Sequence, residues 1–215
     1  MALILVGGKA GSGKTTVVNM ITQEFESLNI DVKTFALADK LKEMVYMLCK
    51  LYNMPINSVQ DLNTVGVKEK YRHHMQYIGT EICQSIFGKT CWCELIGKQI
   101  AEHINMTHGV AIISDLRFEH EFEYFFGEEF NKLLKSTITT TVIKVNRPYL
   151  NTNDKEKYLH SSEQQIDNIP TSITVDNSGT LEDLKQRVHT ACREILEVSP
   201  IDAIKCILCN CEKEI

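Results

Sequence analysis

Near its beginning the chain reads Gly8-Lys9-Ala10-Gly11-Ser12-Gly13-Lys14-Thr15, which follows the pattern Gly-x-x-x-x-Gly-Lys-Ser/Thr. The apolar run at 2–6 predicts a buried strand, and the segment from Thr16 onward predicts a helix. The glycines let the backbone turn tightly and direct several N–H groups at one point, where the helix N-terminus adds partial positive charge. The stretch therefore predicts a phosphate loop that binds the polyphosphate of a nucleotide.

This loop supplies most of the candidate contacts with ATP. Lys14 is expected to bridge the β- and γ-phosphates and to act in catalysis, and the Thr15 hydroxyl is expected to bind Mg²⁺. The backbone around these two side chains is expected to hold the phosphates. The other candidate ATP-binding residues of the loop are Gly8, Ala10, Gly11, Ser12, Gly13 and Thr16.

Charge and composition restrict the partners of the chain. The 215 residues carry a formal net charge of −5, which argues against general DNA or RNA binding, since that requires a basic surface. The apolar start is too short for a signal or membrane-spanning segment, and no other stretch is long and apolar enough. We expect small-molecule partners and a cytoplasmic protein, in the cytoplasm of a host cell if it is viral.

The eight cysteines do not form the pattern of a secreted disulfide framework. Cys49, Cys83 and Cys192 fall in apolar helical patterns, where a buried reduced thiol is common. Only the C-terminal Cys206, Cys209 and Cys211 have a spacing typical of metal ligands, and no histidine near them offers a fourth ligand. We therefore favour packed or surface thiols over a metal site there.

Strand and helix patterns alternate along the chain. Apolar and β-branched runs predict strands at 2–6, 31–36, 109–115, 139–145 and 172–176, and helical spacing predicts helices that include 39–52, 70–86, 93–104 and 181–195. This alternation predicts an α/β fold with three layers, in which helices cover both faces of a parallel sheet. We expect one α/β domain over 1–197 and a cysteine-containing tail over 198–215.

Several charged residues follow predicted strands and are candidates for the chemistry. Because ligands of such sheets bind at the carboxyl ends of the strands, Asp115 is expected to face the phosphate loop and to bind Mg²⁺ directly or through water. Arg117 follows it, and Arg147 precedes a polar segment at about 148–160 that we expect to be a lid. Both guanidinium groups are candidates for neutralising the transferred phosphoryl group.

Structural interpretations of these residues stay open. Asp115 can equally cap a strand end or form an ion pair. Asp39 and Lys42 open the helix after the second strand, where they can contact an acceptor or simply occupy an exposed first turn. The segment 160–163, which follows the polar segment, offers a base in His160 and an acid in Glu163. It also fits a helix-capping arrangement.

Several stretches occur in the order found in one known family. The segments 8–16, 35–42, 72–81 with Trp92, 114–121, 145–148, 160–163 and 177–184 resemble those of the viral and phage deoxynucleoside monophosphate kinases. The resemblance extends over residues 2 to about 197, and it is far more specific than any one segment. It implies Mg²⁺-dependent transfer of the γ-phosphoryl group of ATP to a deoxynucleoside monophosphate (dNMP).

The resemblance also implies roles for individual residues. Asn177 and Gly179 lie in the segment that borders the adenine of ATP in that family. The resemblance implies acceptor-binding helices at about 57–105. It is also consistent with a homodimer of this chain. The implied acceptor-binding residues are Asp39, Lys42, Arg72, Gln76, Thr80, Trp92, His160 and Glu163.

One position departs from the family pattern. Gln84 stands where the family usually has an arginine, so the way in which the acceptor phosphate is held and the preferred base are open. The tail after residue 197 also lies outside the resemblance.

Other functions compete with this one. A phosphomevalonate-kinase-like enzyme shares the phosphate loop and a similar Ser-Glu segment, but its acceptor would need mainly cations, whereas Gln76, Tyr77 and Trp92 offer partners for a base. A shikimate- or dephospho-coenzyme-A-kinase-like acceptor meets the same objection. A nucleotide-gated switch or a non-catalytic nucleotide-binding module is a further alternative, but the chain lacks the Asn-Lys-x-Asp motif by which such switches read guanine.

Overall fold

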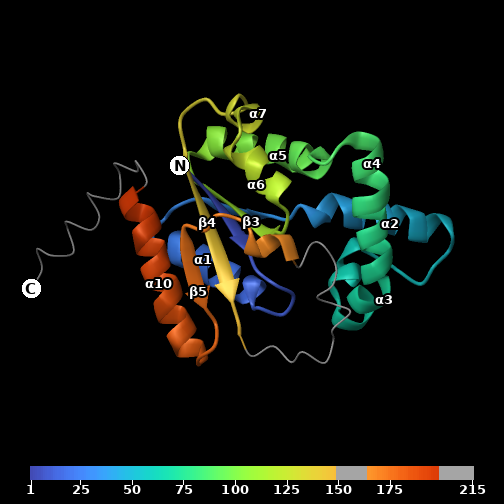
Figure 1. Ribbon diagram of the computed structural model, residues 1–215, viewed down its shortest axis with the longest axis horizontal. Helices are drawn as coiled ribbons and strands as arrows, with labels where there is room; N and C mark the ends of the chain where they lie inside the picture. Colours follow the sequence, from blue (N-terminus) through green and yellow to red (C-terminus); the bar gives the residue numbers. More distant parts are fainter. Residues whose placement is uncertain (149–163, 199–215) are drawn as a thin grey trace, which may run out of the picture.

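The computed structural model describes residues 1–148 and 164–198. In this part of the chain, five parallel strands form one sheet in the order β2-β3-β1-β4-β5 (Figure 1). The strands are β1 (Ala2–Gly7), β2 (Val32–Phe35), β3 (Val110–Leu116), β4 (Thr139–Asn146) and β5 (Ile173–Asp176). Gly7 at the end of β1 pairs with Leu116 of β3 and with Lys144 of β4, so the strand end that precedes the phosphate loop lies beside the end of β3 that contains Asp115.

Helices cover both faces of this sheet. On one face α1 (Lys14–Ser27) and α10 (Leu181–Val198) pack against Ala2, Ile4 and Val6 of β1, and on the other α5 (Cys91–Thr107), α6 (Glu119–Phe126) and α7 (Glu128–Asn131) pack against Leu3 and Leu5. Alternate residues of one strand therefore enter two separate cores. This explains why the strands read as continuous apolar runs.

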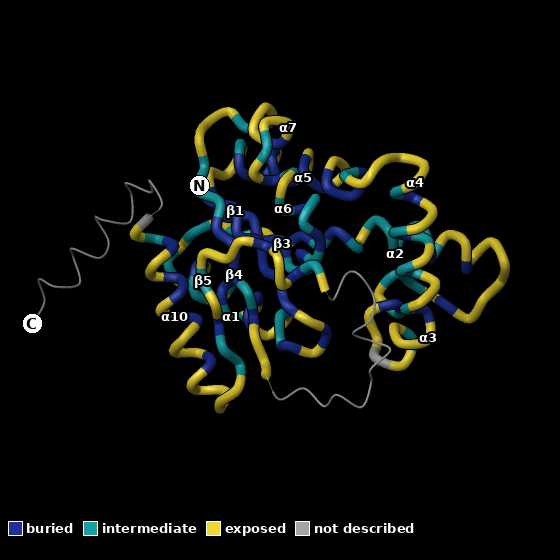
Figure 2. Tube along the Cα trace, in the orientation of Figure 1, coloured by how far each residue is buried: buried dark blue, intermediate teal, exposed yellow. Residues whose placement is uncertain are grey.

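A lobe of helices lies beyond the sheet, at the right of Figure 1. It contains α2 (Ala38–Leu51), η1 (Val59–Asn63), α3 (Val65–Gln76), the π-helix η2 (Tyr77–Cys83) and α4 (Gln84–Phe87). Its own small core packs Val45 and Cys49 of α2 against Leu62 and Tyr71. Figure 2 shows buried strands at the centre of the molecule and exposed outer surfaces on the lobe.

The predicted fold class is confirmed: the structure has helices on both faces of a parallel sheet. The predicted strands match the observed ones to within about two residues. The helix predicted at 70–86 is part of a longer helical segment from Val65 to Phe87 that contains the π-helix η2. The sequence patterns did not identify α6 and α7, which lie between β3 and β4, nor the short η3 (Gln165–Asp167).

Parts of the sequence predictions lie outside the described residues. These are almost all of the expected lid at about 148–160, the acceptor candidates His160 and Glu163, and the tail with Cys206, Cys209 and Cys211. Among the helices of the described ranges, none has the length and apolar character needed to cross a membrane.

Candidate active site

The phosphate loop joins β1 to α1 through backbone conformations that favour glycine. Gly8, Gly11 and Gly13 have φ angles of 151°, 78° and 95°, and Gly13 is the residue directly before the first turn of α1. A Cβ atom on Gly8 would lie 2.5 Å from the carbonyl oxygen of Val145, so both conformation and space exclude a side chain there. The three glycines thus allow the tight turn of the backbone from β1 into the N-terminus of α1 that the sequence predicts.

Two side chains hold this loop in shape. The Lys14 ammonium donates hydrogen bonds to the carbonyl oxygens of Gly8 at 2.6 Å and Lys9 at 2.9 Å. Asn177 directly follows β5, the edge strand of the sheet, and its side-chain amide donates to the carbonyl oxygen of Ser12 at 2.9 Å. Asn177, an expected ATP-binding residue, therefore braces the loop directly. The Ser12 hydroxyl is buried and has no hydrogen-bond partner within the described residues.

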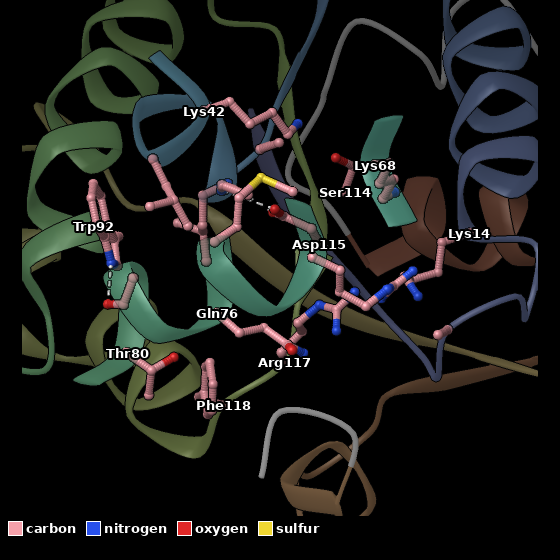
Figure 3. A pocket seen from close by; sticks show the side chains of 18 of the residues that line it. Lys14, Lys42, Lys68, Gln76, Thr80, Trp92, Ser114, Asp115, Arg117 and Phe118 are labelled. Atoms are coloured by element: carbon pink, nitrogen blue, oxygen red, sulfur yellow. Dashed lines mark hydrogen bonds between the residues drawn. The ribbon is translucent and has the colours of Figure 1, made fainter. Parts of the chain in front are cut away.

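A cavity of about 510 Å³ opens between this loop and the helical lobe. Figure 3 shows Lys14 at one end, Trp92 and Thr80 at the other, and Asp115 and Arg117 between them. Its walls come from the loop, the start of α2, the α3–η2–α4 segment and the end of β3. Of the sequence candidates, it is lined by Ala10, Gly11, Gly13, Lys14, Thr15, Lys42, Arg72, Gln76, Thr80, Trp92, Asp115 and Arg117, and also by Gln84.

Asp115 lies in this wall with both carboxylate oxygens already engaged. Oδ1 accepts a hydrogen bond from the backbone N–H of Leu37 at 2.7 Å, and Oδ2 accepts one from Ala38 at 3.0 Å. Asp115 therefore ties the end of β3 to the N-terminus of α2, a structural role that differs from the strand-end cap and the ion pair considered from the sequence. Thr15 lines the same cavity, so two hard oxygen ligands of the kind Mg²⁺ prefers face one space.

Positive charge gathers in the middle of the cavity. Lys42 comes from α2, Lys68 and Arg72 from α3, and Arg117 from the turn after β3. Removal from water lowers the pKa of Lys68, and the nearby charges of Arg72, Lys42 and Arg117 lower it further. Such mutual repulsion favours the binding of an anion among these groups.

Two of these cations are also held by acids on their own helices. Arg72 forms a bidentate contact with Glu69, with N···O distances of 3.0 and 3.2 Å, and Lys42 pairs with Asp39 at 2.9 Å. Asp39 itself is exposed and is not among the described residues that line the cavity, so it reaches the site only through Lys42. A partly exposed ion pair of this kind orients a side chain more than it stabilises the fold.

The α3–η2–α4 segment presents a row of polar side chains to the cavity. In a regular α-helix, positions four apart drift by about 40° each step, so such a row would wind away from the site. The wider turn of the π-helix η2 offsets this drift. The cavity is consequently lined by the successive polar residues Lys68, Arg72, Gln76, Thr80 and Gln84.

The end of the cavity away from the phosphate loop is amphipathic. The Trp92 indole N–H donates to the Gly79 carbonyl oxygen at 3.1 Å, which fixes α5 against η2 (Figure 3). Phe118 lines the opposite side and stacks on His120 with ring centroids 5.1 Å apart. The amide nitrogen of Gln84 lies 3.5 Å from Nε2 of His120. Aromatic faces and amides together suit a planar, hydrogen-bonding ring.

Sequence reasoning missed two charged residues of this cavity. Lys68 lies four residues before Arg72, so the four-residue spacing of the polar row would have identified it. Glu121 is buried at 6% exposure and also lines the cavity. It is the last residue of the segment 114–121 whose resemblance to the kinase family is described above, but its burial depends on how α6 packs.

Arg147 lies elsewhere. Together with Lys9, Ser12 and Lys144, it lines a second cavity of about 310 Å³ on the β4 side of the phosphate loop, where Asp167 bridges Lys9 and Lys144 at 2.7 and 2.8 Å. The described structure thus does not bring Arg147 to the cations of the first cavity, and its catalytic role stays a prediction. Gly8, Thr16 and Gly179 line neither cavity.

The metal prediction also stays a prediction. Within residues 1–148 and 164–198, no group of three or more His, Cys, Asp or Glu side chains is placed to hold a metal ion. A site built from Thr15, Asp115 and the oxygens of a bound polyphosphate would not require such a group.

Comparisons with known proteins place this geometry in context. Solved structures similar to the chain include a shikimate kinase from Aquifex aeolicus (16% identity, 92% of this chain and 99% of that chain, TM-score 0.38) and a gluconokinase from Sinorhizobium meliloti 1021 (11%, 91% and 94%, TM-score 0.44). Likeness at these identities and TM-scores carries no weight for function. The curated proteins include no match.

A family model provides the assignment. The model described as deoxynucleotide monophosphate kinase matches residues 56–188, which is more than half of the chain. The match begins just before η1 and ends within α10, so it includes α3 and η2. With its phosphate loop, the chain is a kinase, a phosphotransferase that binds nucleotide, and it belongs to the deoxynucleotide monophosphate kinase family.

Proposed function

We propose that this enzyme transfers the γ-phosphoryl group of ATP to a deoxynucleoside monophosphate, giving ADP and a deoxynucleoside diphosphate. The observation that carries the proposal is a single cavity that joins the phosphate loop to a cluster of cations and then to an aromatic, amide-lined end. These three parts match a polyphosphate donor, an acceptor phosphate and an acceptor base in linear order. The family assignment supports the same substrate class.

The donor phosphates bind at the loop. The backbone N–H groups and the N-terminus of α1 neutralise their charge, and the Lys14 ammonium exchanges its contacts with the Gly8 and Lys9 carbonyls for phosphate oxygens. Thr15 and Asp115 would hold Mg²⁺, which supplies charge neutralisation at the phosphates. We place the ATP nucleoside on the β4–β5 side, near Asn177 and Gly179.

The acceptor binds along the opposite side of the cavity, against a surface that we call the acceptor wall. It is formed by Lys42, Lys68, Arg72, Gln76, Thr80 and Arg117. The cations hold the acceptor phosphate, so the wall supplies positive charge without the arginine that the family usually has at position 84. The base extends toward Gln76, Trp92 and Phe118.

The chemistry then depends on position and charge. An oxygen of the acceptor phosphate attacks the γ-phosphorus, and the bond to the β–γ bridging oxygen breaks as ADP leaves. Arg117 lies between the two nucleotide sites and stabilises the charge of the transferred group. A phosphate monoester is already anionic, so the reaction requires no strong general base. Arg147 is a second candidate for this task from the β4 side.

The test is a panel of acceptors. The four deoxynucleoside and four ribonucleoside monophosphates, with phosphomevalonate and shikimate, are each incubated with enzyme, ATP and Mg²⁺, and formation of ADP and phosphorylated acceptor is measured. We expect turnover with at least one dNMP and none with phosphomevalonate or shikimate, because neither of those acceptors offers a planar heteroaromatic base to the aromatic, amide-lined end. Turnover with phosphomevalonate alone would show that the acceptor has been misidentified.

A further inference from the structure

Glu121 occupies an unusual position in this site. From the first turn of α6, its Oε2 atom accepts hydrogen bonds from two successive backbone N–H groups, that of Arg117 at 2.8 Å and that of Phe118 at 3.0 Å. Arg117 faces the cations of the cavity and Phe118 faces the aromatic end. One carboxyl oxygen thus fixes the turn from which both parts of the acceptor site project.

A second acid in the chain makes the same pair of bonds in a different setting. Oδ2 of Asp61 accepts from the backbone N–H groups of Asn57 at 2.8 Å and Ser58 at 3.2 Å, at the start of η1. Asp61 is only partly buried, and those bonds lower its pKa. Burial instead raises the pKa of Glu121 to about 8 despite its two backbone bonds, with Asp115 adding repulsion and Arg117 opposing it.

The comparison separates helix capping from a functional role. Capping of a helix start is achieved by a partly buried acid such as Asp61, so it does not require full burial of a carboxyl group in the wall of an anion-binding cavity. Burial of an acid costs free energy because the carboxyl group loses its contacts with water. Capping alone would not require that cost. The geometry points instead to the turn itself as the feature that must be held.

We propose that Glu121 is a positioning residue for phosphoryl transfer, which holds the Arg117–Phe118 turn so that the guanidinium and the aromatic ring meet one acceptor nucleotide in a fixed relation. The proposal rests on the acceptor site described under the proposed function. It places Glu121 behind the reacting groups rather than among them. Loss of the Glu121 carboxyl group should therefore change KM for the acceptor and kcat, and leave the binding of ATP nearly unchanged.

Steady-state kinetics of three variants test this role. Glu121→Ala removes the acceptor of both N–H bonds, and we expect KM for the dNMP to rise and kcat to fall by about tenfold each, with KM for ATP changed less than about twofold. Glu121→Gln keeps an oxygen for both bonds and should restore both parameters to within about threefold of the original enzyme. Asp61→Asn is the matched control, and it should leave all three parameters unchanged.

The outcomes are decisive in both directions. Normal acceptor KM and kcat in Glu121→Ala, or equal loss for ATP and dNMP, would overturn the proposal, as would a Glu121→Gln enzyme as impaired as Glu121→Ala. If Glu121→Ala does not fold, Glu121→Asp replaces it, because its shorter side chain cannot keep both bonds at their present lengths. An original enzyme inactive with every dNMP would contradict the proposed function instead, so the two failures are distinguishable.

Discussion

The phosphate loop and the acceptor wall face each other across one cavity but are built in different ways. The loop is a contiguous stretch in which glycine conformations and backbone groups define the site, and its side-chain braces are Lys14 and Asn177. The acceptor wall collects side chains from α2, α3, η2 and the turn after β3. Backbone sites tolerate little change in conformation, whereas side-chain sites distribute binding over many groups.

This difference predicts how mutations should act. Loss of a loop group that faces the main cavity should reduce turnover steeply, because such a group is expected to contact the reacting phosphates. A change in the acceptor wall should be graded and should appear first in the KM of the acceptor. Four substitutions test this contrast.

Lys14→Ala should have the largest effect. Loss of the ammonium that neutralises the transferring phosphates should lower kcat by about 10²–10³-fold, the range seen when one charge-stabilising donor is removed. Lys9→Ala is the control, because Lys9 lies in the same loop but pairs with Asp167 outside the main cavity. Similar activity in the two variants, both folded by circular dichroism, would mean that the loop does not hold the donor.

Lys68→Met tests the acceptor wall. It keeps the length of the side chain and removes one of the clustered charges, so KM for the dNMP should rise by about tenfold, as expected for one charge-assisted contact, while KM for ATP stays constant. Lys98→Met changes an exposed lysine on α5 and should alter neither. An increase in KM for ATP instead would place Lys68 at the donor.

Gly79→Ala tests the packing that supports the wall. The added Cβ would lie 2.7 Å from Cδ2 of Leu41, so the Leu41 side chain, which lines the cavity, must move. We expect a loss of about 1–3 kcal/mol in the free energy of unfolding and a severalfold rise in acceptor KM. Gly66→Ala, in the same helical segment with open space around it, should stabilise the protein by about 0.5–1 kcal/mol. Denaturant titrations of both variants measure the difference.

Glu121→Gln should show the smallest effect, visible in the pH dependence of stability. The pKa of Glu121 rises from an ordinary 4.5 to about 8 on folding, so the folded state binds more protons between these values and stability falls as pH rises through that window. The glutamine variant lacks this proton linkage. Its Tm should therefore decline less between pH 6 and 9 than that of the original protein, and parallel declines would contradict burial of the acid.

The phosphate loop was predictable from the sequence because its parts are neighbours in the chain. Gly8 to Thr15, with the strand before them and the helix after them, required no knowledge of distant contacts. Arg72, Gln76 and Thr80 were identified through family resemblance, and the structure adds the reason that they share a face: the π-helix η2. Nothing in local helix propensity signals that wider turn.

Other features were beyond the sequence patterns for a physical reason. Asp115 was located correctly at a strand end, but its bonds to Leu37 and Ala38 depend on where α2 begins relative to β3. Arg117 and Arg147 are both candidates for the transferred phosphoryl group, and they line different cavities because β3 and β4 flank opposite sides of β1. To assign a carboxylate or a guanidinium group to one cavity, the order of the strands in the sheet must be known.

Local chemistry was enough to predict a phosphate loop and a parallel sheet, because glycine conformation, strand hydrophobicity and helix polarity act over a few residues. The acceptor wall, the engagement of Asp115 and the buried acid Glu121 arose from packing between segments far apart in the chain. Desolvation and charge proximity depend on distances in space, and those distances exist only after the helical lobe has docked beside the sheet.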